Sequence, residues 1–160
     1  MFKINRSTQI GLYFGLTSAT ITTLGLMVGL YSSTSSKLVV LGGIITIAIA
    51  DACSDALGIH ISEESQNDNQ KGVWLATLFT FLSKFLFALT FLIPVVLLPL
   101  NWAVLVGIGW GALALIFLSW RMAKDNHNKP WITIVEHLSI AILVVIITYL
   151  TGEFIAKYFN

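Results

Sequence analysis

The sequence predicts an all-α, polytopic membrane protein with five transmembrane helices, and its composition and hydropathy carry that prediction. Of its 160 residues, 56% are hydrophobic and only 11% are charged, whereas soluble domains usually have about a quarter charged residues. The mean hydropathy is +0.85. We therefore expect a single transmembrane domain over residues 1–160, with short loops and a lipid bilayer around it.

Five apolar segments follow one another, and each has the roughly 20 residues that a helix needs to cross a bilayer core. Polar, turn-forming stretches separate them at 31–37, 62–72 and 123–130. The third segment is overlong, and Pro94 and Pro99 predict that its far end kinks or unwinds. Alternatively, the third and fourth segments form one re-entrant hairpin. The predicted spans are 8–31, 38–60, 73–99, 101–120 and 131–152.

Lys and Arg are unequally divided between the two sides of such a protein. The N-terminus and the loops after the second and fourth spans share one side, and basic residues favour the cytoplasm. We expect a cytoplasmic N-terminus in a multi-pass protein of a plasma, inner or organelle membrane. The first segment is too long for a signal core and is expected to be retained. The side with more basic residues, the N-terminal side, has Lys3, Arg6, Lys71, Arg121, Lys124 and Lys129, and the opposite side has Lys37 and Lys157.

The first span repeats small residues at a spacing of four. Gly11 and Gly15 form one pair, and Gly25 and Gly29 form another. This spacing lets helix backbones approach closely, and the Ser and Thr residues between the glycines can bond across the contact. The pattern suits tight packing within one protomer, and it also suits a dimer interface or a pore-facing surface.

Asp51 and Asp55 lie inside the second span, one turn apart and therefore on one helix face. A carboxylate at bilayer depth costs about 2.5–3.5 kcal/mol, so both need a cation, a proton or a basic partner. Hard divalent cations prefer carboxylate oxygens, and Fe²⁺ and Mn²⁺ also accept imidazole. We expect the two aspartates to be core metal ligands; the alternative is a charge pair with Lys84.

Lys84 lies near the middle of the third span. A lysine at that depth needs an acidic partner or loses its proton, and we expect it to pair with Asp51. In a transporter it would balance charge or link metal movement to protons, and the other interpretation is an ordinary structural ion pair.

Glu136 and His137 lie about 9–10 Å into the fifth span, a depth that matches Asp55. We expect them to converge with Asp55 as additional metal ligands. The alternative is that Glu136 pairs with Arg121 or Lys129 near the headgroups, because side chains near a helix end can reach the surface.

Glu63 and Glu64 belong to an acidic loop on the otherwise basic side. They are candidate entrance groups that would concentrate cations, or they are plain solvated loop residues.

Several function classes have no support. The net charge of +1 gives no reason to expect a nucleic-acid partner. No nucleophile elbow, phosphate-binding glycine loop, CxxC pair or HExxH motif is present, so we expect no enzyme and no cofactor, with a divalent metal ion as substrate instead.

The first two spans resemble the vacuolar iron transporter family. That family has a first span with Asp-Gly-Leu followed later by Gly-Leu, and a second span that ends in a small-SMGxGxYxSxxSE motif. The resemblance covers about 11–66, and the later spans agree only in number and orientation. At the family's first-span aspartate this chain has Phe14, and at its second-span methionine it has Asp55. The matching positions are Gly15, Leu16, Gly29, Leu30, Ala52, Ser54, Gly58, Ser62 and Ser65.

The resemblance implies a five-span homodimer that packs around the first spans and moves Fe²⁺ or Mn²⁺ out of the cytoplasm in exchange for protons. The family's glutamate-rich cytoplasmic insert is reduced here to SEESQNDNQKG (62–72), and its final Ser-Glu becomes Ser65-Gln66. A rival interpretation is a non-transporting membrane interaction subunit that keeps the fold.

Overall fold

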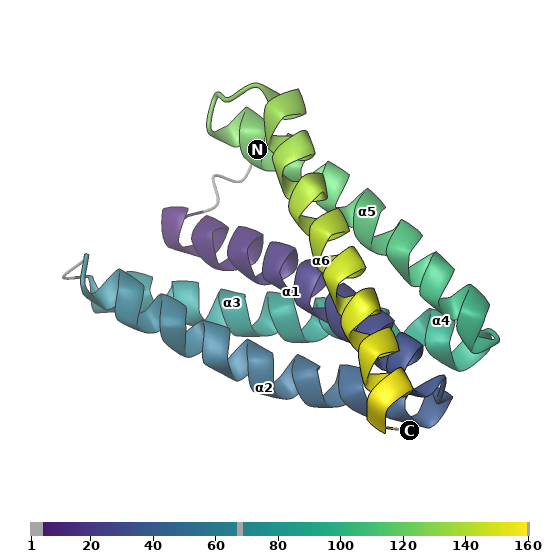
Figure 1. Cartoon of the computed structure of the whole chain (residues 1–160). Coiled ribbons are helices and arrows are strands. Elements are labelled where there is room, and N and C mark those ends of the chain that lie inside the picture. The colour runs from purple at the N-terminus through teal and green to yellow at the C-terminus, as the bar shows by residue number, and fades with distance from the viewer. Residues whose placement is uncertain (1–4, 67–68, 160) are drawn as a thin grey trace.

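The computed structural model describes residues 5–66 and 69–159, and this part of the chain is helical and contains no strand (Figure 1). Five of its helices are long and apolar enough to cross a membrane. The protein is therefore an all-α polytopic membrane protein, as the sequence predicts. The helices are α1 (Arg6–Thr34), α2 (Lys37–Glu64), α3 (Gln70–Thr90), α4 (Leu92–Leu97), α5 (Leu100–Asp125) and α6 (Pro130–Phe159).

The third span is α3 followed by the short α4, with a break at Phe91. Pro94 explains the break, because it has no N–H for the carbonyl four residues earlier, at Thr90. The predicted kink is present, and the span ends at Leu97. The following helix, α5, has 26 residues of its own, so α3–α4 and α5 are two long helices and not one re-entrant hairpin.

The helices extend beyond the apolar segments, and the loops are correspondingly shorter. Only Ser35 and Ser36 separate α1 from α2, and Ser35 turns the chain with a left-handed backbone (φ 50°). Residues 126–129 alone separate α5 from α6. Hydropathy marks the apolar part of each helix, whereas the polar residues at the ends simply continue the hydrogen-bonded backbone.

Helix α1 is the centre of the bundle. It packs against α2, α3, α5 and α6, and it is the most buried of the five spans. Figure 1 shows α2 and α3 lying together beside α1, while α6 crosses α1 and meets α5 at the end near the N-terminus. Helix α6 packs against α1 and α5 and is the least buried span. The bundle therefore has an α2–α3 side and an α5–α6 side, with α1 between them.

The glycines of α1 make close helix contacts within the protomer. A Cβ on Gly15 would come within 2.1 Å of Ser83 Oγ in α3, and one on Gly11 within 2.5 Å of the Ala76 carbonyl oxygen. At the other end, a Cβ on Gly25 would lie 2.8 Å from Val144 in α6. One half of α1 thus needs glycine to approach α3, and the other half needs it to approach α6.

Two kinds of core hold the spans together. Large apolar side chains fill one end of the bundle, where Met27, Ile44 and Phe91 are fully buried. At mid-span the core consists of three alanines, Ala19, Ala48 and Ala88, one each from α1, α2 and α3. Because alanine is small, these three helices meet closely there, and polar side chains at the same level can reach one another.

Candidate functional site

The candidate site lies at the middle of the spans. Asp51 is fourteen residues after the start of α2 and thirteen before its end, and Lys84 has the same position in the span Gln70–Leu97. Both charges are therefore as far from the helix ends as the chain allows. Charged side chains at such a depth have to find partners inside the protein.

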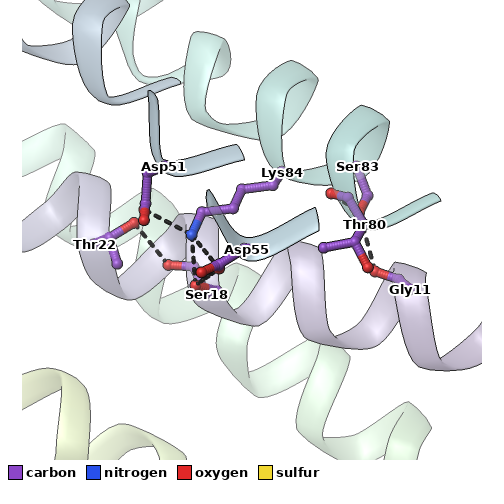
Figure 2. A network of polar contacts seen from close by, with 8 residues as sticks. All are labelled: Gly11, Ser18, Thr22, Asp51, Asp55, Thr80, Ser83 and Lys84. Carbon is purple, nitrogen blue, oxygen red and sulfur yellow. Dashed lines mark hydrogen bonds and ion pairs between the residues drawn. The ribbon is translucent and has the colours of Figure 1, made fainter. Parts of the chain in front are cut away.

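Lys84 bridges both aspartates. Its Nζ lies 2.6 Å from Asp51 Oδ2 and donates a short hydrogen bond to Asp55 Oδ2. It also donates to Ser18 Oγ at 2.8 Å, and the Ser18 hydroxyl donates to Asp55 Oδ2 at 2.7 Å. Figure 2 shows the three oxygen-bearing side chains, from α1 and α2, gathered around the ammonium that α3 supplies. Lys84 therefore pairs with Asp51, as predicted, and it pairs with Asp55 as well.

The two aspartates are not equivalent. Asp55 receives hydrogen bonds from Lys84 and from Ser18. Asp51 Oδ2 has the ion pair, but it accepts no hydrogen bond from any residue that the structure describes. Asp51 is therefore the carboxylate with more unused bonding capacity.

Exposure also differs within the cluster. The Lys84 side chain is 2% exposed, whereas those of Asp51 and Asp55 are 24% and 21% exposed. The ammonium is enclosed, and the carboxylates can be approached from the side away from it. Two carboxylates and one ammonium carry a net charge of −1, which attracts a further cation or a proton in a low-dielectric setting.

Close contact between α1 and α3 holds Lys84 in place. Ser83 Oγ donates to the Gly11 carbonyl oxygen at 3.3 Å and to the Thr80 carbonyl oxygen at 3.2 Å. In Figure 2 these residues lie to the right of Lys84, whose ammonium points the other way, toward the aspartates. Any side chain at Gly15 would displace Ser83 or the α3 backbone, so the small residues of α1 allow the segment of α3 that carries Lys84 to approach α1.

Glu136 and His137 do not join this cluster. Glu136 is exposed on α6, and His137 Nδ1 lies 2.8 Å from Ser119 Oγ in α5. Within residues 5–66 and 69–159, no three His, Cys, Asp or Glu side chains are close enough to hold a metal ion. The predicted convergence with Asp55 is therefore absent, because α1 lies between the helices that carry the two sets.

The alternative pairing of Glu136 with Arg121 is not seen either. Arg121 Nη1 lies 3.4 Å from Asp125 Oδ1, one turn further along α5. Asp125 Oδ2 in turn accepts a short hydrogen bond from the Tyr13 hydroxyl of α1. This second polar cluster was not predicted, although the i,i+4 spacing of Arg121 and Asp125 is a recognisable signal.

Glu63 and Glu64 belong to the last turn of α2 and not to a loop as predicted, and they differ in their surroundings. Glu64 is exposed, whereas Glu63 is 8% exposed and lines a cavity of about 340 Å³ between the ends of α1, α2 and α3. Glu63 and Asp55 are eight residues apart and so lie toward the same side of α2. The cavity lining is mainly polar, with Arg6, Ser7, Gln66 and Asn69 among its residues.

Ser18 is the site residue that sequence reasoning did not single out. It is one of five hydroxyl-bearing residues between Thr17 and Thr23, and the sequence cannot tell which of them faces the aspartates. Thr22, one turn further on, donates its hydroxyl hydrogen to the Ser18 carbonyl oxygen at 2.9 Å instead.

Comparison of the chain with protein-family models, with curated proteins and with solved structures finds no match. The resemblance to vacuolar iron transporters therefore rests on the residues within 11–66 alone.

Proposed function

We propose that this protein is a transporter that moves a divalent metal ion, Fe²⁺ or Mn²⁺, out of the cytoplasm in exchange for protons. One observation carries the proposal: oxygen atoms of Asp51, Asp55 and Ser18 converge on a single cation at mid-span. In the structure that cation is the Lys84 ammonium. Carboxylate and hydroxyl oxygens are also the ligands of hard divalent ions.

Lys84 acts in this proposal as a tethered substitute for the transported ion. When a metal ion binds Asp51 and Asp55, it competes with the ammonium for the same oxygens. When the ion leaves, Lys84 or a proton neutralises the carboxylates again. A carboxylate that alternates between metal-bound and protonated states links the ion to a counter-flow of protons.

Access to the site would begin at the end of α2 where Glu63 and Glu64 lie. The Lys and Arg distribution predicts that this end is cytoplasmic. Glu63 lines the cavity there, and Asp55 lies two turns further along α2 toward the membrane centre. Acidic groups at a mouth raise the local cation concentration, so both glutamates serve as entrance groups in this scheme.

A homodimer through the first span belongs to the same proposal. The glycines of α1 are occupied by α3 and α6, so the partner surface would be what remains of α1. A groove of about 520 Å³ follows the second half of α1 between α2 and α6. Phe14 stands at the position of the first-span aspartate of the similar family, and its apolar side chain cannot bind a metal ion.

Transport by purified protein in liposomes tests the proposal. We expect Mn²⁺ or Fe²⁺ uptake under a pH gradient, and loss of that uptake in Asp51→Asn combined with Asp55→Asn. Glu153→Gln is the matched control, because Glu153 is an exposed acidic residue near the C-terminal end of α6, away from the aspartates. Equal uptake by the double variant and the control would exclude the assigned site.

A second candidate function is a non-transporting membrane interaction subunit. It is favoured by the fact that Lys84 already neutralises one carboxylate charge and contacts both aspartates. The two functions differ in their response to metal. A transporter that binds Mn²⁺ is stabilised by mass action and melts at a higher temperature with added Mn²⁺, whereas the subunit melts at the same temperature with metal or chelator.

A further inference from the structure

A second cavity, of about 480 Å³, lies on the α5–α6 side of α1. It opens between the first half of α1, the last turn of α5 and the first turns of α6. Arg6, Gln9 and Asn126 line it near the helix ends, whereas Ile10, Phe14 and Met122 supply apolar walls. The cavity thus combines hydrogen-bond donors with an apolar wall that reaches further into the span.

The cavity lining has one basic residue, Arg6, and one acidic residue, Asp125. The Asp125 carboxylate is already engaged, because it receives the Tyr13 hydroxyl and faces Arg121 at 3.4 Å. The Arg6 side chain is exposed and lines the cavity, so a positive group remains for an anion.

Aromatic residues mark the depth of the cavity mouth. Trp120, in the last turns of α5, and Trp131, in the first turn of α6, lie at the same end of the helices as the cavity and are 39% and 74% exposed. Lys124 lies 4.0 Å above the Trp120 ring. Exposed tryptophans with basic neighbours are typical of the level of lipid headgroups. The polar mouth is therefore at headgroup level, and the wall formed by Phe14 is at the level of acyl chains.

We propose that this cavity binds one anionic phospholipid. Its phosphate accepts hydrogen bonds from Arg6 and from the amide groups of Gln9 and Asn126, and an acyl chain lies along Ile10, Phe14 and Met122. Basic pockets between helices on the side rich in Lys and Arg are suited to anionic headgroups. The apolar wall favours a lipid over a free anion, and the inference does not depend on metal transport.

Native mass spectrometry of the full chain in a non-ionic detergent tests the proposal. We expect the protein to bind phosphatidylglycerol in preference to phosphatidylcholine, with one tight site. Arg6→Gln should weaken that first binding step about fivefold, the effect of one basic charge near a membrane surface. Excess inorganic phosphate should not displace the lipid.

Lys71→Gln is the matched control, because Lys71 is exposed at the same end of the bundle but on α3. It should leave the affinity for phosphatidylglycerol unchanged, and both variants should melt like the parent in phosphatidylcholine. Equal losses in Arg6→Gln and Lys71→Gln would show general surface attraction and overturn the proposal. No preference for phosphatidylglycerol, or displacement of the lipid by phosphate, would overturn it as well.

Discussion

The two polar clusters on opposite sides of α1 contain similar groups in very different surroundings. Around Lys84 the cation is 2% exposed and lies at mid-span. Around Asp125 the cation, Arg121, is 41% exposed and lies in the last two turns of α5. Buried ion pairs are costly to break because the remaining charge has no water, whereas exposed pairs add little. The depth of each cluster, more than the types of its residues, therefore decides how much it contributes to the stability of the fold.

The largest expected effect comes from removing the buried cation. Lys84→Met leaves Asp51 and Asp55 facing each other without a counter-charge, and we expect a loss of about 3–5 kcal/mol in the free energy of unfolding. Unfolding in detergent, followed by circular dichroism, measures it. Lys84→Met combined with Asp51→Asn and Asp55→Asn should recover much of the loss; a triple variant no more stable than Lys84→Met would contradict the ion-pair explanation.

An intermediate effect is expected where α1 approaches α3. Gly15→Ala places a Cβ 2.1 Å from Ser83 Oγ and 2.7 Å from the Thr80 carbonyl oxygen, and overpacking of this kind costs about 1–3 kcal/mol. Gly58→Ala is the control, because nothing lies within 4 Å of its Cβ position. The same unfolding assay should show no loss for Gly58→Ala; equal losses would mean that helix packing is not the cause.

A smaller effect is expected in the exposed cluster. Asp125→Asn removes the partner of Arg121 but keeps an acceptor for the Tyr13 hydroxyl, so the free energy of unfolding should fall by about 1 kcal/mol or less. A loss as large as that of Lys84→Met would show that the two clusters do not differ as their depths indicate.

The smallest effect is expected at Glu136. It is exposed on α6, and surface substitutions usually stay within about 0.5 kcal/mol. Glu136→Gln should therefore unfold like the parent protein. A clear loss of stability would indicate a partner for Glu136 that lies outside one protomer.

The sequence predicts the spans and the kink well because both depend on local properties. Apolar length sets a span, and Pro94 breaks a helix wherever it stands. The site is predicted only in part. Asp51 and Asp55 share one face of α2, so their joint approach to Lys84 follows from spacing. Depth along a helix does not say which neighbour the helix packs against.

Glu136 illustrates that limit. Its depth matches that of Asp55, yet α6 packs against α1 and α5, away from the aspartates. Ser18 illustrates the opposite case, since it joins the cluster although nothing in its local sequence distinguishes it from the neighbouring threonines. Lateral packing depends on which small residues allow close approach, and that information is spread over several helices.

The central position of Asp51 has an electrical consequence. A charge that travels from either surface to this residue crosses about half of the membrane voltage, and a full crossing at 100 mV amounts to about 2.3 kcal/mol per unit charge. In the proposed transporter, a doubly charged ion would therefore gain or lose about 2.3 kcal/mol on reaching Asp51 at that voltage, which changes its binding constant by about fiftyfold. If the proposed transport occurs, the membrane voltage would therefore change how strongly the ion binds at Asp51.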